Sequence, residues 1–157
     1  MYDKQKLLYE VAKDKNKVLE IGTYVGHSLL LMLLANPKIE VTCIDISDEF
    51  AKASVEYLQS QFPESKINFI HGSSLDVLPT IKEKYDLFHI DGTHKNDIIA
   101  KEFQMCLNLR SSKIMSVVFD DVDTCQRLVN ETINKMNILE YKRPGCSWTN
   151  AYFKIKV

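Results

Sequence analysis

Two kinds of hydrophobic pattern alternate along this chain. Short runs rich in Val, Ile and Phe predict buried strands, and longer segments with apolar residues three and four positions apart predict helices. The predicted strands cover residues 17–21, 39–44, 67–70, 85–90, 114–119, 138–141 and 151–156. The predicted helices cover residues 3–15, 28–35, 48–62, 74–84, 95–109 and 124–136.

Strands that alternate with helices, followed by a terminal strand pair, predict an α/β fold. We expect an open, doubly wound, mostly parallel seven-stranded sheet that ends in an antiparallel hairpin turning around Pro144-Gly145. The sequence shows no linker or repeat, so residues 1–157 are predicted to form a single domain. Ligands of such sheets bind outside the carboxyl ends of the strands. The residues that follow predicted strand ends, and should share that crevice, are Gly22, Asp45, Asp91, Asp120 and Asp121.

Composition and charge exclude several classes of partner. The 20 basic and 21 acidic residues give a net charge of -1, which offers no footprint for nucleic acid or for an anionic membrane. The most apolar stretch, residues 28–35, is too short to cross a bilayer, and no apolar signal region opens the chain. None of the four cysteines is spaced as C-x-x-C. We therefore expect reduced thiols, a cytoplasmic protein, and neither a nucleic-acid nor a membrane partner.

The turn after the first predicted strand carries two glycines, Gly22 and Gly26. Glycine allows a positive φ and a close approach of a ligand, and the helix N-terminus beyond offers free N–H groups. The dinucleotide fingerprint G-x-G-x-x-G is absent, because Tyr24 and His27 occupy its later positions. A carboxylate therefore suits this turn better than a pyrophosphate does, and an NAD-linked oxidoreductase is disfavoured. The alternative is that the two glycines only make a tight turn.

Asp45 ends the second predicted strand. A carboxylate at this point can accept hydrogen bonds from both ribose hydroxyls of an adenosine. Its simpler role is to cap the helix that follows. Combined with the glycine turn at this spacing, Asp45 favours a nucleoside ligand.

Four segments then resemble motifs of one known family. Residues 18–28 resemble the first motif of class I S-adenosylmethionine-dependent methyltransferases, in the form found in catechol-type O-methyltransferases. Residues 71–79 resemble the adenine-side motif of that family, and residues 88–94 and 119–121 resemble its two metal-side motifs. The form Asp-Gly-x-His at residues 91–94 is similar to that of sugar and antibiotic O-methyltransferases.

The resemblance implies roles for the residues of these motifs. Residues of the glycine turn would surround the methionine part of S-adenosylmethionine, Asp45 would hold the ribose and Ile46 would lie against the adenine. Ser74 would lie at the adenine edge, although it could equally cap the following helix. The complete set expected at the cofactor is Glu20, Gly22, Thr23, Tyr24, Gly26, Ser28, Asp45, Ile46, Ser73, Ser74 and Asp91.

Three acids, Asp91, Asp120 and Asp121, are expected to hold a divalent metal. Neighbouring carboxylates repel one another unless a cation or protons intervene, and oxygen ligands suit a hard ion, Mg²⁺ foremost. The resemblance implies the same metal role. For Asp121 a solvated turn remains an alternative, because the family has either Asn or Asp at this position.

His94 is the candidate general base for the acceptor hydroxyl, with Lys95 as its rival. The other histidines, His27, His71 and His89, are interpreted as structural. Thr93 stands where catechol enzymes have an aromatic wall, so a catechol is not expected.

The resulting hypothesis is an O-methyltransferase that requires a divalent metal and acts on a small hydroxylated acceptor, such as a sugar or natural-product hydroxyl. A metal-independent methyltransferase and a non-catalytic module that binds S-adenosylmethionine remain alternatives. The site is expected to be open, or to be closed by a second subunit of a homodimer.

Overall fold

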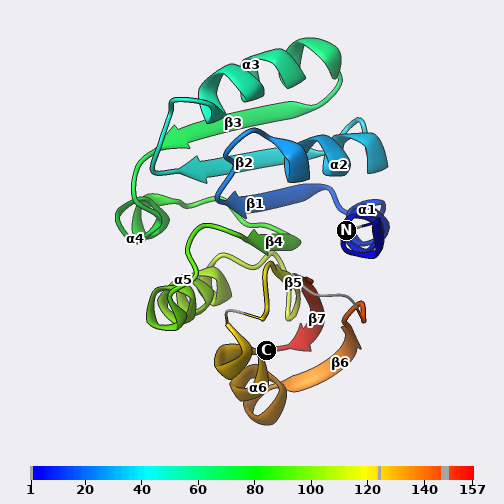
Figure 1. The fold of residues 1–157 in the computed structure, drawn as a ribbon, viewed down its shortest axis with the longest axis vertical. Helices are drawn as coiled ribbons and strands as arrows, with labels where there is room; N and C mark the ends of the chain where they lie inside the picture. Colours follow the sequence, from blue (N-terminus) through cyan, green and yellow to red (C-terminus); the bar gives the residue numbers. More distant parts are fainter. Residues whose placement is uncertain (1, 124, 146–148) are drawn as a thin grey trace.

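One seven-stranded sheet forms the centre of the molecule. The computed structural model describes residues 2–123, 125–145 and 149–157, and within them the strands follow the order β3-β2-β1-β4-β5-β7-β6. Figure 1 shows this order from β3 at the top to β6 at the bottom. Strands β1 to β5 are parallel, and β7 lies antiparallel between β5 and β6. Their bounds are β1 Lys17–Ile21, β2 Glu40–Asp45, β3 Lys66–His71, β4 Leu87–Ile90, β5 Ile114–Phe119, β6 Asn137–Lys142 and β7 Ala151–Lys156.

Helices cover both faces of the sheet and bury two apolar clusters against it. One cluster joins Leu8, Leu33 and Val55 of α1, α2 and α3 to one face, and the other joins Phe103 and Val129 of α5 and α6 to the opposite face. Successive strand residues alternate between the two clusters, as the pleat of a strand requires. The helices are α1 Tyr2–Ala12, α2 His27–Ala35, α3 Ala51–Gln61, α4 Ser74–Val77, the 3₁₀ helix η1 Leu78–Thr80, α5 Asn96–Asn108 and α6 Gln126–Lys135.

The strand order reverses at β1, which lies between β2 and β4. Backbone bonds tie the strand ends together there: Gly22 N–H donates to the carbonyl of Ile44, and Asp91 N–H donates to that of Ile21, both at 2.8 Å. This point is where open α/β sheets bind ligands. The predicted fold class, an open and mostly parallel seven-stranded sheet with a terminal antiparallel hairpin, is confirmed.

The predicted helix over residues 74–84 is wrong in length. The structure has only the single turn of α4, followed by η1 and an extended segment that leads to β4. Pro79 explains the early end, because proline has no N–H to continue the α-helical bonding and its ring opposes the preceding turn.

Two further expectations can be compared with the structure. None of the helices in the described part of the chain combines the length and the apolarity that a bilayer crossing needs. Cys43, Cys106 and Cys125 are buried thiols. Cys146 lies outside the described residues, as does residue 124, where the last predicted helix was expected to begin.

Candidate functional site

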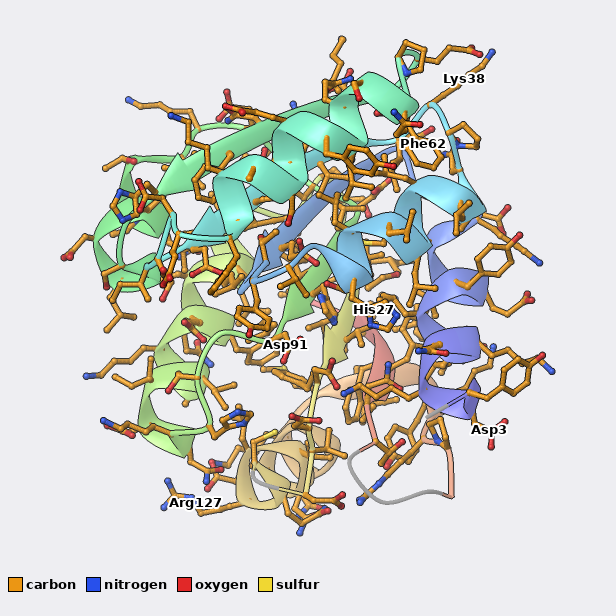
Figure 2. The ribbon with its side chains drawn as sticks, turned by 45° about the horizontal axis from the view of Figure 1, so that its top comes forward. Asp3, His27, Lys38, Phe62, Asp91 and Arg127 are labelled. Atoms are coloured by element: carbon orange, nitrogen blue, oxygen red, sulfur yellow. The ribbon has the colours of Figure 1, made fainter. Side chains whose placement is uncertain are left out.

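A cleft of about 720 Å³ opens over the carboxyl ends of the central strands, at the reversal of strand order. The loops after β1, β2, β3 and β4 line it, together with residues of α1 and α5. In Figure 2, Asp91 lies at the centre of this region, and His27 lies at the start of α2 beside α1. The predicted site residues on the lining are Gly22, Thr23, Tyr24, Ser28, Asp45, Ile46, Ser73, Ser74, Asp91, Lys95 and Asp120. Those outside the lining are Glu20, Gly26, His94 and Asp121.

The glycine turn has the backbone that its sequence predicts. Gly22 has a φ of 87°, and a Cβ atom there would lie 2.3 Å from the carbonyl oxygen of Asp91. Gly26, the N-cap residue directly before α2, has a φ of 76°. Tyr24 between them also has a positive φ of 46°, which is uncommon outside glycine and is often found at ligand sites. The turn is thus a constrained structure packed directly against the end of β4.

Asp45 holds this turn in place. Its Oδ2 accepts hydrogen bonds from the backbone N–H groups of Thr23 and Tyr24, each at 2.8 Å, and its Oδ1 accepts one from the N–H of Ser47 at 2.9 Å. A carboxylate offers about four acceptor positions. The carboxylate therefore has room on Oδ1 for about one further donor, whereas the sequence suggested that it would accept two ribose hydroxyls.

Glu20 lies beneath the turn rather than in the cleft. It is fully buried, and it accepts hydrogen bonds from the hydroxyls of Ser28 at 2.5 Å and Thr23 at 3.1 Å. The sequence suggested that Glu20 would contact the cofactor. The structure instead places it behind two residues that line the cleft, where it fixes their orientation.

Two of the three predicted metal ligands come together with a histidine. Ligand atoms of His89, Asp91 and Asp120 lie within 4.8 Å of one another. The third predicted ligand, Asp121, lies outside this group and forms an ion pair with Lys4 of α1, whose Nζ is 2.9 Å from its Oδ1 and 2.6 Å from Oδ1 of Asp120. Within this acidic group, His89 and Lys4 are the residues that the sequence did not indicate as part of the site. No local pattern marks Lys4, because its partners lie more than a hundred positions away along the chain.

The charges of this acidic group are balanced within the protein. Burial alone would lower the pKa of His89, but Asp120 and Glu20 raise it to about 10, so its imidazole is protonated at neutral pH. Burial and the charge of Asp120 raise the pKa of Asp91 to about 8. Burial opposes ionisation of Asp120, but His89 and Lys4 hold its pKa well below its usual range. Asp120 is therefore the more readily ionised of these two acids.

The group of His89, Asp91 and Asp120 can hold a divalent ion if its protonated members lose their protons. Two carboxylates and an imidazole are a mixed oxygen and nitrogen set, and the Nε2 atom of His89 is buried without a hydrogen-bond partner among the residues that the structure describes. Mn²⁺ accepts both kinds of ligand, whereas Mg²⁺ prefers oxygen. Because a metal binds only deprotonated ligands, binding through this set requires His89 and Asp91 to release protons.

The two candidate bases differ in position. His94 is exposed in the turn between β4 and α5 and does not line the cleft. Lys95, the residue before α5, lines the cleft. Of the two, the geometry brings Lys95 to the site.

An open sheet with a glycine turn, an acid after β2 and a cleft at the reversal of strand order has the features typical of α/β proteins with a ligand site at the carboxyl ends of the strands. A methyltransferase domain family matches residues 19–122, and the chain belongs to this family.

Individual relatives are more distant. The chain is 26 % identical to O-methyltransferase hkm8 of Aspergillus hancockii over 114 residues, which are 71 % of this chain and 45 % of that protein. It is 31 % identical to catechol O-methyltransferase of Mus musculus over 75 residues, which are 47 % of this chain and 28 % of that protein. The chain thus spans less than half the length of either relative.

Solved structures share the fold. The crystal structure of the O-methyltransferase TomG from Streptomyces achromogenes, in complex with S-adenosylmethionine, matches all of this chain and 81 % of that chain. The TM-score is 0.77 at 19 % sequence identity, so the likeness is one of fold.

Proposed function

We propose that this chain is the core of an S-adenosylmethionine-dependent O-methyltransferase that acts on a small hydroxylated acceptor, such as a sugar or natural-product hydroxyl. The observation that carries the proposal is one continuous cleft, whose lining includes residues 22–25 of the glycine turn and Asp45 together with Asp91 and Asp120. Membership of the methyltransferase domain family and the O-methyltransferase names of the relatives support it.

The residues of the cleft divide the work between cofactor and acceptor. Ser28 and the backbone of the glycine turn bind the methionine part, Asp45 accepts a hydrogen bond from the ribose, and Ile46 lies against the base. S-adenosylmethionine supplies the methyl group. Asp91 and Asp120 lie on the acceptor side, where Lys95 is the first candidate to take the hydroxyl proton and His94 the second.

A divalent ion is part of the proposal. Asp91, Asp120 and His89 would hold it, and as a Lewis acid it would lower the pKa of an acceptor hydroxyl. The competing possibility is a metal-independent enzyme, and one observation favours it: the ammonium group of Lys4 already neutralises Asp120 at 2.6 Å.

We also propose a cellular compartment, a class of partner and an oligomeric state for the enzyme. Three buried thiols support a reducing, cytoplasmic environment. The net charge of -1 supports a small molecule as partner rather than nucleic acid or a membrane. A homodimer would close the cleft with a second subunit.

Binding is tested by calorimetric titration with S-adenosylhomocysteine and by thermal unfolding. Because a ligand that binds only the folded state stabilises it by mass action, a concentration of 100 times Kd should add roughly 2.7 kcal/mol and raise the Tm. Absence of binding at millimolar ligand would overturn the proposal. Transfer of a labelled methyl group to a panel of sugars and phenols, with and without EDTA, then separates the metal-dependent enzyme, the metal-independent enzyme and a module that binds without transfer.

A further inference from the structure

A buried acid that the proposed reaction does not use faces the same cleft. Glu102 of α5 lines the cleft although only 1 % of its surface is exposed. Its Oε1 accepts a hydrogen bond from the hydroxyl of Ser74 at 2.5 Å. Its Oε2 is buried without a hydrogen-bond partner among the described residues. A buried carboxylate oxygen without a partner is costly, so this position favours any ligand that brings a donor to it.

The cleft that Glu102 lines also offers apolar surface for a flat ring. Ile46, Leu75 and Ile98 supply apolar surface to the lining, and Ser74 supplies a hydroxyl. Gly92 lies beside the carboxylate, and even a Cβ atom there would be 3.8 Å from Oε1. Because Gly92 has no side chain, none from this position stands between the acid and the cleft. A cleft that combines apolar side chains with a few polar groups is suited to a planar base.

The hydrogen-bonding chemistry of a carboxylate determines which edge of a purine can bind to Glu102. An ionised carboxylate only accepts hydrogen bonds, so it pairs with an amino group and opposes a carbonyl oxygen. Burial raises the pKa of Glu102, but the hydrogen bond from Ser74 opposes this shift and favours the ionised form. An amino donor at Oε2 would favour that form further.

We propose that Glu102 binds the exocyclic amino group of the purine in this cleft and makes the site select a 6-amino purine over a 6-oxo purine. Ser74 holds the acid in the required orientation through Oε1, which leaves Oε2 for the ligand. The inference rests on the proposed function, because it takes the ligand to be an adenosine derivative.

The test compares S-adenosylhomocysteine with S-inosylhomocysteine, whose purine carries a 6-oxo group in place of the 6-amino group and an N1–H donor in place of the N1 acceptor. Their Kd values are measured by calorimetry at pH 8 for the wild type, for Glu102→Gln and for the control Lys101→Gln on the exposed side of α5. The wild type and the control should prefer the 6-amino ligand by about tenfold or more. In Glu102→Gln the preference should shrink or reverse, because an amide can donate to the 6-oxo group while its oxygen still accepts from Ser74.

The outcomes are distinguishable. If the wild type does not bind S-adenosylhomocysteine, the proposed function fails and this inference fails with it. If the wild type binds it but Glu102→Gln keeps the same ratio of Kd values, only this inference is overturned. An equal weakening of both ligands in a variant with wild-type circular dichroism also overturns it, since that result means Glu102 acts only by holding Ser74.

Discussion

At the scale of single residues, Gly22 is the glycine of the site at which an added side chain would overlap most strongly with neighbouring backbone. Its φ of 87° is unfavourable for a residue with a side chain, and a Cβ atom would lie 2.3 Å from the Asp91 carbonyl oxygen. We expect Gly22→Ala to lower the free energy of unfolding by roughly 2–3 kcal/mol or more, because strain and overlap add. Urea unfolding followed by circular dichroism measures the change. The control is Gly145→Ala, where an added Cβ meets nothing within 4 Å, and an equal loss in both variants would contradict the argument.

His89 predicts how stability depends on pH. Its folded pKa of about 10 exceeds its ordinary value of 6.5, so the folded state holds a proton that the unfolded chain has lost. The stabilisation is complete below pH 6.5 and is lost as pH rises through 10. Asp91, raised to about 8, acts in the same direction at lower pH. Between pH 8 and 10 we therefore expect the free energy of unfolding of the wild type to fall by an amount on the order of 1–3 kcal/mol.

Denaturant unfolding at several pH values measures this slope. His89→Gln, which cannot take up the proton, should be less stable at pH 8 and should show a smaller fall. His94→Gln changes an exposed imidazole and should keep the wild-type slope. Parallel slopes for the wild type and His89→Gln would show that His89 is not protonated in the folded state.

At the scale of elements, α1 contacts the acidic group through Lys4. Lys4 pairs with Asp120 and Asp121, and its backbone carbonyl accepts a hydrogen bond from the side chain of Asn150 just before β7 at 3.1 Å. Its ammonium group is therefore a resident cation that a divalent ion would have to displace or tolerate. We expect Lys4→Met to bind Mn²⁺ at least about tenfold more tightly than the wild type, because a competing positive charge is removed.

Mn²⁺ binding is measured by electron paramagnetic resonance and calorimetry on both proteins. Lys6→Met removes the same charge from the exposed side of α1 and should leave the affinity unchanged. An unchanged or weaker affinity in Lys4→Met would mean that Lys4 does not compete with a metal.

Elements were more predictable than the contacts between them. Hydrophobic periodicity predicted the strands at residues 17–21, 114–119 and 151–156 where the structure has them, because short apolar runs of that length are typical of buried strands. It failed at residues 74–84, where apolar spacing continued past Pro79 and the proline ended the helix. Strand ends identified Gly22 and Asp45, since topology alone brings such residues to one edge.

The site residues that could not be predicted from the sequence are those that act through partners far away along the chain. In the sequence, Glu102 has the pattern of an ordinary helix residue. Its role depends on the contact with Ser74, which lies 28 positions away along the chain. Lys4 meets Asp121 across 117 positions. His89 lies inside a strand, and only the pairing of β1 with β4 places it beside Glu20. Periodicity describes which face a residue takes, but not which residue of another element it meets.

At the scale of the whole molecule, the two apolar clusters share one sheet. Neighbouring strand residues such as Val18 and Leu19 point into opposite clusters, so loosening one face disturbs the strands that support the other. This arrangement predicts that the chain unfolds as one cooperative unit, as expected for a single domain. It also makes the cleft, which lies at the ends of those strands, dependent on both faces.

Leu33→Ala tests this coupling. Leu33 is fully buried between α2 and the sheet, so its truncation should lower the free energy of unfolding by roughly 2–5 kcal/mol. If the two faces unfold together, native-state hydrogen exchange should report the same loss for the most protected amides of α5, on the opposite face, as for those of α2. Leu34→Ala, at a neighbouring position that is 51 % exposed, should change either set little. Amides of α5 that keep wild-type protection in Leu33→Ala would instead show two independent units, and a cleft supported from one side only.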